Sequence, residues 1–231
     1  AALARAYGGH GETVRTTAEF APAFERARAS GKPAIIHCFL DSQAITPTTT
    51  IDAIRAKAMA GKTRAMARLS TVDILGKLVA FDTTSRNSNL PLLDWVEDYL
   101  TGFGIAGERV YDETGQKANL WVTIGPKDTA GYVLSGHVDV VPVDGQDWST
   151  DPFRLAGADG RYYGRGTCDM KGFVASCLAA VPDMVAAPLA KPIHLAISYD
   201  EEVGCRGVRT LLAVLKDRPL KPEACFVGEP T

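Results

Sequence analysis

Residues 131–142, with the sequence GYVLSGHVDVVP, read as an apolar strand that becomes polar only at its carboxyl end. His137 and Asp139 lie two residues apart at that end, and because strand side chains alternate, both point the same way. A single histidine in a strand is more often a core residue than a ligand. The nearby carboxylate changes this interpretation, since a metal-binding imidazole usually donates its second N–H to such a group. We therefore expect His137 to bind a metal ion and Asp139 to orient it.

Strand-like and helix-like runs alternate along the chain around this stretch. Apolar strand-like runs occur at 120–124, 132–141, 193–199 and 224–227, and helical runs at 71–79, 90–102, 170–185 and 207–216. This alternation predicts an α/β/α sandwich with a mostly parallel central sheet. Because open α/β sheets bind ligands at the carboxyl ends of their strands, polar residues at those ends are candidates for one shared site.

A second polar segment, GRGTCDMKG at residues 164–172, leads into the helical run that follows. Its glycines favour a turn in which Asp169 caps the next helix. A carboxylate at such a turn can also present one oxygen to each of two cations. The segment alone leaves both roles open for Asp169.

Acidic residues follow two further strands. The segment SYDEEVGC, residues 198–205, contains three adjacent carboxylates, for which a solvated loop is the simplest interpretation. A metal ion would relieve their repulsion, with Glu202 as a ligand and Glu201 facing the reacting water as general acid and base. Asp200 is then structural. Glu229, just past the strand at 224–227, indicates little by itself.

The donor set as a whole favours a transition-metal site. One imidazole with several carboxylates suits Zn²⁺, with Co²⁺ or Mn²⁺ as substitutes. The predicted ligands are His137, Asp169, Glu202 and Glu229, and the predicted catalytic residues are Asp139 and Glu201.

HVDVVP, GRGTCDMKG, DEEVGC and GEPT, in that order and spacing, resemble the dinuclear zinc aminoacylase and carboxypeptidase family of metallopeptidases. The resemblance covers about residues 64–231, and around DWSTDPF, YGRGTCDMKGF and DEEVGC it is strongest to acetylornithine deacetylases. It implies that Asp169 bridges two Zn²⁺ ions, that His137 and Glu229 complete one site and that Glu202 holds the other. It further implies Glu201 as general base and Asp139 as orienter of the histidine.

The resemblance also implies a reaction, the deacetylation of N2-acetyl-L-ornithine to L-ornithine and acetate in arginine biosynthesis. Succinyl-diaminopimelate desuccinylase and metallo-carboxypeptidase activities are the alternatives within the family. Family members continue past GEPT into a lid and dimerisation domain and then supply a further histidine ligand. His10, His37 and His194 lie in the wrong segments to replace it. We therefore expect an inactive fragment whose parent enzyme is a homodimer.

The first 62 residues differ in pattern from residues 63–231 and predict a small αβα segment, with helices at 17–30 and 48–60 and a strand at 34–40. ARAYGGHGETV, RARASGKPAII and AITPTTT resemble the carboxyl end of a thiamine diphosphate enzyme of the acetolactate synthase type. No acidic cofactor motif precedes them, so this remnant should bind no thiamine cofactor. A non-catalytic fusion fragment is the alternative from another class.

Composition narrows the possible partners. With a net charge of -2, 46% hydrophobic and 23% charged residues, the chain lacks the basic excess that binds nucleic acid or an anionic membrane. No run of about 18 apolar residues and no signal peptide are visible. The five widely spaced cysteines fit reduced thiols. These features predict a cytoplasmic enzyme with a small-molecule substrate.

Overall fold

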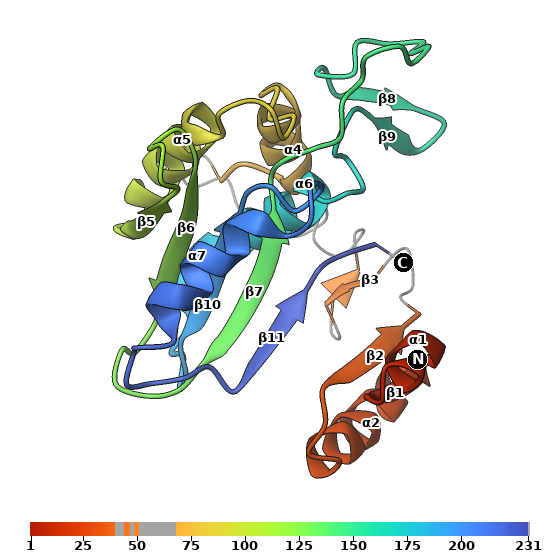
Figure 1. Cartoon of the computed structure of the whole chain (residues 1–231), viewed down its shortest axis with the longest axis vertical. Helices are drawn as coiled ribbons and strands as arrows, with labels where there is room; N and C mark the ends of the chain where they lie inside the picture. Colours follow the sequence, from red (N-terminus) through yellow and green to blue (C-terminus); the bar gives the residue numbers. More distant parts are fainter. Residues whose placement is uncertain (40–43, 47–48, 51–67, 231) are drawn as a thin grey trace. The chain divides into compact units, whose positions relative to one another are not determined.

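The computed structural model describes residues 1–39, 44–46, 49–50 and 68–230. The chain divides into two compact units, Ala1–Arg64 and Ala65–Thr231 (Figure 1). This division falls within two residues of position 62, where the sequence pattern changes.

The first unit is built on a pair of parallel strands joined by a helix. Its elements are α1 (Ala2–Ala6), β1 (His10–Val14), α2 (Thr17–Ala29) and β2 (Ala34–Cys38), followed by the short antiparallel pair β3 (Ala44–Thr46) and β4 (Thr49–Thr50). The predicted αβα order lacked β1, because this strand has only one large apolar residue, Val14, to reveal it. The helix expected at 48–60 lies outside the described residues, except for Thr49–Thr50, which are a strand instead.

The second unit contains a five-stranded sheet in the order β11-β7-β10-β6-β5. The strands are β5 (Gly107–Tyr111), β6 (Ala118–Ile124), β7 (Tyr132–His137), β10 (Ile193–Ser198) and β11 (Ala224–Val227). The strand β7 is parallel to both β10 and β11, whereas β6 is antiparallel to both β10 and β5. All strands except β6 therefore run in one direction. The sheet is mixed, and the predicted α/β fold is confirmed.

Helices cover both faces of this sheet. On one face, α4 (Thr71–Val79), α5 (Leu90–Thr101) and α6 (Lys171–Ala186) enclose the larger apolar core; on the other, α7 (Arg206–Leu215) packs a smaller cluster. In Figure 1, α7 lies in front of the sheet and α6 behind it. Alternation along β6 supplies both cores, since Leu120 and Val122 enter the larger one and Trp121 the smaller. The predicted sandwich is thus observed.

The strand β7 ends earlier than predicted, and this end shapes the site. The chain leaves the regular ladder after His137, although Val138 still donates its N–H to the Ser198 carbonyl at 3.0 Å. Val140 then pairs with the loop after α4, donating its N–H to the Thr83 carbonyl at 3.1 Å. The segment that carries Asp139 is therefore held between β10 and this loop.

A small hairpin outside the main sheet, β8 (Ala156–Ala158) and β9 (Arg161–Tyr163), precedes the segment that carries Asp169. This hairpin was not predicted from the sequence, because its strands are only three residues long.

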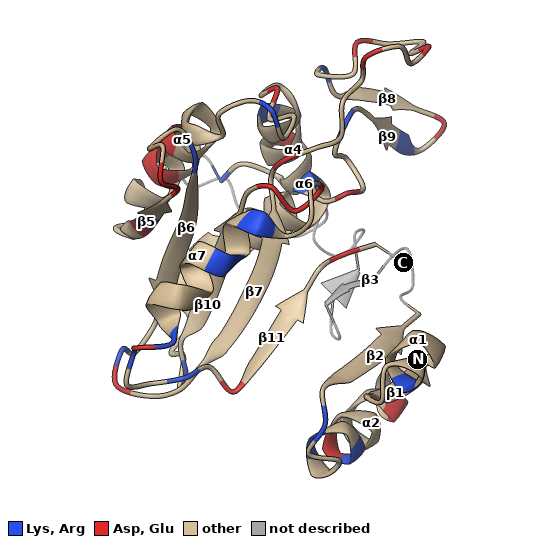
Figure 2. Cartoon of the chain, viewed as in Figure 1, with Lys and Arg blue, Asp and Glu red and all other residues tan. Residues whose placement is uncertain are grey.

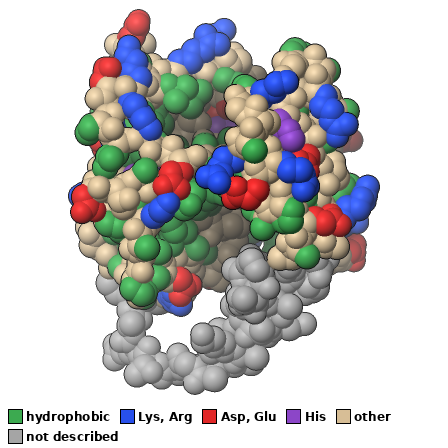
Figure 3. All heavy atoms as spheres, turned by 90° about the horizontal axis from the view of Figure 1, so that it is seen from below, with side chains coloured by type: hydrophobic (Ala, Val, Ile, Leu, Met, Phe, Trp, Pro, Cys, Tyr) green, Lys and Arg blue, Asp and Glu red, His purple; other side chains and the backbone are tan. Residues whose placement is uncertain are grey.

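The charge pattern is mixed over both units. Figure 2 shows basic and acidic residues interspersed along the chain, and Figure 3 shows them mingled with apolar side chains over the face that it presents. Within the described ranges, every helix is too short or too polar to cross a bilayer.

Candidate metal centre

His137 ends β7 with its side chain 1% exposed. Its Nδ1 lies 2.9 Å from the main-chain oxygen of Asp139 and 3.2 Å from the carboxylate Oδ1 of the same residue. Both of these atoms are acceptors, so Nδ1 carries a proton. The other ring nitrogen, Nε2, is the atom that His137 can offer to a metal ion.

Asp139 is 2% exposed, and its hydrogen bonds hold several parts of the site together. Its carboxylate accepts hydrogen bonds from the Ser85 hydroxyl at 2.7 Å and from the main-chain N–H groups of Glu201 and Glu202 at 3.0 and 3.2 Å. Burial alone would raise the pKa of Asp139, but the bonds from His137, Glu201 and Ser85 outweigh it and lower this pKa. Asp139 is therefore an anion that fixes both the histidine and the acidic loop.

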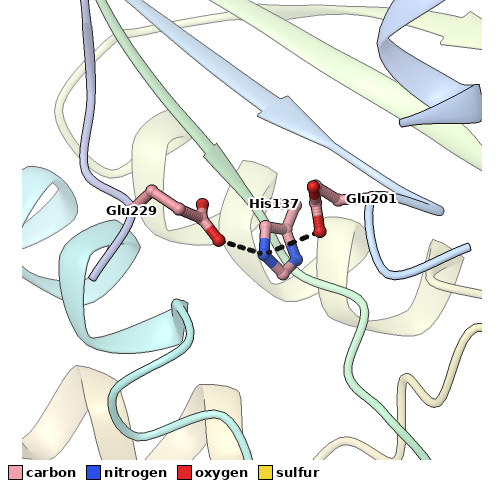
Figure 4. Close-up of side chains that lie close together, drawn as sticks. All are labelled: His137, Glu201 and Glu229. Carbon is pink, nitrogen blue, oxygen red and sulfur yellow. Dashed lines mark ion pairs between the residues drawn. The ribbon is translucent and has the colours of Figure 1, made fainter. Parts of the chain in front are cut away.

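Carboxylates surround the free nitrogen of His137. Nε2 lies 3.0 Å from Asp169 Oδ1, 3.7 Å from Glu229 Oε1 and 3.8 Å from Glu201 Oε2. Figure 4 shows Glu201 and Glu229 reaching this ring from opposite sides. The predicted acids from three separate segments thus meet at one imidazole.

Two overlapping groups of side chains are close enough to share a cation. One contains His137, Glu201 and Glu229, and the other contains His137, Asp169 and Glu202, with ligand atoms within 4.8 Å of one another. The described part of the chain has no other group of this kind. The division of ligands between two ions that the family resemblance implies remains a prediction.

Asp169 reaches the site by a different route from the one predicted. It does not follow a strand of the main sheet but lies in the turn between the β8–β9 hairpin and α6. Nor does it cap that helix, because Met170 holds the N-cap position and no side chain caps it. The Asp169 carboxylate is therefore available to His137.

Electrostatics show an excess of negative charge around the imidazole. Burial would lower the pKa of His137, but the Asp139 hydrogen bond and the charges of Asp139, Glu229 and Glu201 raise it to about 9. Burial, reinforced by the charge of Asp169, raises the pKa values of both Glu202 and Glu229. A cation at the centre would offset this crowding of carboxylates. One imidazole and several carboxylates also form a donor set that Zn²⁺ accepts, so the residues fit such an ion.

The remaining histidines have other partners. His10 Nε2 pairs with Glu12 at 2.6 Å in the first unit, and His194 Nδ1 pairs with Thr123 Oγ1 at 3.0 Å on the main sheet. His37 also lies in the first unit, on β2.

Three residues that support the site were not predicted from the sequence. Ser85 has no neighbouring motif that would mark it as a partner of Asp139. Lys171 is fully buried and donates to the carbonyl oxygens of Leu78 and Phe81 at 2.9 and 2.8 Å, and only its place beside Asp169 could have drawn attention to it. Lys117 pairs with Asp200 at 2.6 Å, which gives that aspartate a partner away from His137.

A family model matches the part of the chain that carries the predicted site residues. Residues 133–231 match the profile of peptidase family M20/M25/M40, and this part of the chain carries a domain of that family. This match confirms the family expectation at that level.

Several solved structures share the fold of this chain. Human carnosine dipeptidase 1 is 30% identical with a TM-score of 0.56, over 64% of this chain and 35% of that one. An M20 family metallo-carboxypeptidase, Sso-CP2 from Sulfolobus solfataricus, is 18% identical with a TM-score of 0.60, over 69% and 37%. The LapA aminopeptidase of Legionella pneumophila is 13% identical with a TM-score of 0.51, over 82% and 48%. The chain thus corresponds to about a third to a half of the length of these proteins.

Proposed function

We propose that residues 65–231 are part of the catalytic domain of a metal-dependent hydrolase that cleaves the amide bond of an N-acylated amino acid. The observation that carries this proposal is the buried His137, whose Nε2 faces Asp169, Glu201 and Glu229 within 3.8 Å. A buried imidazole among carboxylates, with its second nitrogen held by Asp139, has the donors of a hydrolytic zinc site.

Each side chain then has a role in the reaction. His137, Asp169, Glu202 and Glu229 hold the metal, proposed to be Zn²⁺ in two positions, with Co²⁺ or Mn²⁺ as substitutes. Bound cations would lower the pKa of the attacking water and polarise the acyl oxygen. Glu201 takes the proton of that water and passes it to the leaving amine. Asp139 holds His137 in the tautomer that exposes Nε2.

The contacts of Glu201 support its role as the base. Its Oε1 accepts the Cys205 thiol at 3.2 Å, while its Oε2 faces His137 Nε2 at 3.8 Å. One oxygen is thus anchored and the other points toward the proposed metal position.

For the substrate we propose N2-acetyl-L-ornithine, on the resemblance of DWSTDPF, YGRGTCDMKGF and DEEVGC to acetylornithine deacetylases. N-succinyl-diaminopimelate and small peptides are the competing substrates, the latter because a carnosine dipeptidase and a metallo-carboxypeptidase share the fold. Hydrolysis assays on all three compounds separate them.

Metal binding is the first test, because it needs only the residues described. We expect the purified chain to bind Zn²⁺ in a calorimetric titration. His137→Ala and Glu229→Gln should each weaken binding by more than about tenfold, since even supporting residues cost about 10–100-fold. Glu113→Gln, an exposed acid outside the site, is the matched control. Equal affinities in all four proteins would refute the metal site.

Turnover is the second test. We propose that residues of the parent protein beyond this chain supply a further ligand and a lid, so N-acetylornithine hydrolysis by the chain with Co²⁺ should be weak. Glu201→Gln should keep the metal affinity and abolish what turnover there is. Hydrolysis far above that of Glu201→Gln would show that the further segments are dispensable.

The first unit contributes none of the six proposed site residues. We propose that it is the remnant of a thiamine diphosphate enzyme, and a titration with thiamine diphosphate and Mg²⁺ should detect no binding to it.

A further inference from the structure

A cavity lies at the end of the sheet's strands opposite to the end that carries the proposed metal site. It has a volume of about 220 Å³ and is lined by the end of β6, the segments just before β7 and β10, and the chain that follows α7. His137 lies at the far end of β7, and the six residues of this strand separate the two places by about 20 Å. The cavity is therefore independent of the metal chemistry.

Two stacked rings line this cavity. Trp121 and His194 have ring centroids 4.7 Å apart and planes inclined by 25°. His194 Nδ1 is held by the Thr123 hydroxyl at 3.0 Å. Burial and the charge of Arg218 lower the pKa of His194, so its ring is neutral at pH 7. Trp121 is only 5% exposed and has the Arg218 guanidinium 5.5 Å from its ring centroid, so the partly exposed His194 ring presents the surface on which another ring can stack.

Basic side chains accompany these rings. Lys127, Arg218 and Lys221 line the cavity, and no lining residue is acidic. Arg218 pairs with Glu108 at 2.6 Å, and Lys221 donates to the Leu215 carbonyl at 3.0 Å. Lys127, in contrast, makes no hydrogen bond or ion pair within the described part of the chain. Its charge is available to a ligand. Figure 2 shows basic and acidic positions interspersed in the loops at the lower ends of β6, β7 and β10.

Prolines stiffen the wall. Pro192, Pro219 and Pro222 all line the cavity, and each fixes its own backbone φ angle. A wall of this kind changes little when a ligand enters, which lowers the entropic cost of binding. The volume is below the roughly 300–1,000 Å³ of sites for drug-sized ligands, so the ligand must be smaller than those.

We propose that this cavity binds a small planar organic anion, with its ring on the His194 imidazole and its carboxylate paired with Lys127. The proposal does not depend on the hydrolase activity. A ligand of this class would have one ring and one carboxylate.

Benzoate is the probe, and benzamide, which has the same shape without the charge, is its matched control. We expect benzoate to bind the full chain in saturation-transfer NMR and in a calorimetric titration at millimolar concentration. Benzamide should bind at least about threefold more weakly, as expected from the loss of one partly exposed ion pair. Lys127→Met should weaken benzoate binding by a similar factor, whereas Lys77→Met on the surface of α4 should not.

A second pair of measurements separates this site from the metal centre. Benzoate binding should persist in His137→Ala and should be lost in His194→Ala, which removes the ring on which the ligand stacks. Loss of benzoate binding in His137→Ala would assign the carboxylate to the metal centre and overturn the proposal. Equal affinities for benzoate and benzamide, an unchanged Lys127→Met variant, or no binding of benzoate would also overturn it.

Discussion

The Asp139 carboxylate accepts a hydrogen bond from the main-chain N–H of Glu201 at 3.0 Å. The same carboxylate lies 3.2 Å from His137 Nδ1, so one buried side chain positions both the proposed ligand and the proposed general base. Asp139→Asn replaces one acceptor oxygen by an amide donor, which cannot accept the N–H groups and the imidazole together. We expect Zn²⁺ affinity to fall by about 10–100-fold.

Two further variants test the origin of this loss. Ser85→Ala removes the hydroxyl that donates to Asp139 at 2.7 Å and should cause a smaller loss of Zn²⁺ affinity. Asp144→Asn, an exposed aspartate paired with Arg86, should have the affinity of the unaltered chain. If Asp139→Asn bound Zn²⁺ as tightly as Asp144→Asn, Asp139 would have no orienting role.

Metal binding should depend on pH because the cation displaces a proton. The surrounding carboxylates raise the pKa of His137 to about 9, so without metal its ring is protonated at neutral pH. Below this pKa, Zn²⁺ must release one proton from Nε2, and its affinity should fall by about tenfold for each pH unit. Titrations with a zinc-buffering chelator at pH 6.5, 7.5 and 8.5 measure the slope. An affinity that is constant over this range would contradict the protonated imidazole.

The sequence was sufficient to predict elements with strong apolar periodicity. The helix at 71–79 and the strand at 224–227 agree with the structure residue for residue: a buried apolar face defines the helix, and an unbroken run of four apolar residues defines the strand, although three of its side chains are exposed. The strands β1, β5, β8 and β9 were missed because they are short or largely polar. Runs this short show no clear apolar alternation, even where the partner is local, as in β8 and β9, which pair with each other across the turn at Asp159 and Gly160.

In the candidate site, too, some residues could be predicted from the sequence and others could not. Residues at strand ends, such as His137 and Glu229, could be placed together from the rule that parallel strands finish at one edge. Asp169 arrives through a loop, so its segment could be identified by its motif but not by its route. The hydrogen bonds of Ser85 and Lys171 bridge residues 54 and 90 or more positions apart, and no local motif reports such contacts.

Two glycines of the second unit should respond in opposite ways to alanine. Gly76 lies inside α4, where an added Cβ would meet only Leu155 at an ordinary 3.7 Å. Gly76→Ala should therefore stabilise the unit by about 0.5–1 kcal/mol. At Gly207, in the first turn of α7, the Cβ would lie 2.1 Å from the main-chain oxygen of Tyr199. Gly207→Ala should destabilise the unit by about 1–3 kcal/mol, because α7 must move away from Tyr199, the residue that follows β10.

Urea unfolding followed by tryptophan fluorescence measures both effects, since all three tryptophans, Trp95, Trp121 and Trp148, lie in this unit. A Gly207→Ala variant as stable as Gly76→Ala would show that α7 does not approach Tyr199 so closely.

The buried amino group of Lys171 should make the stability of the protein depend on pH. It is fully buried and donates to the carbonyl oxygens of Leu78 and Phe81 at the end of α4. Burial lowers the pKa of Lys171 to about 7, against the opposing charges of Asp82 and Asp139. In the unfolded chain this pKa returns to about 10.4, so between pH 7 and pH 10 the unfolded state binds more protons. The free energy of unfolding should therefore rise with pH through this range.

Lys171→Met removes this titration while keeping a long side chain. It also leaves the two carbonyl groups without their donor, and each loss lowers the free energy of unfolding by up to about 3 kcal/mol. All other titrating groups are shared, so the difference in unfolding free energy between the two proteins isolates Lys171. This difference should shift in favour of the unaltered chain by about 2 kcal/mol from pH 7 to pH 9, at up to about 1.4 kcal/mol per pH unit. Urea titrations at pH 7, 8 and 9 provide the measurement, and a difference that does not change with pH would show that Lys171 stays charged in the folded protein.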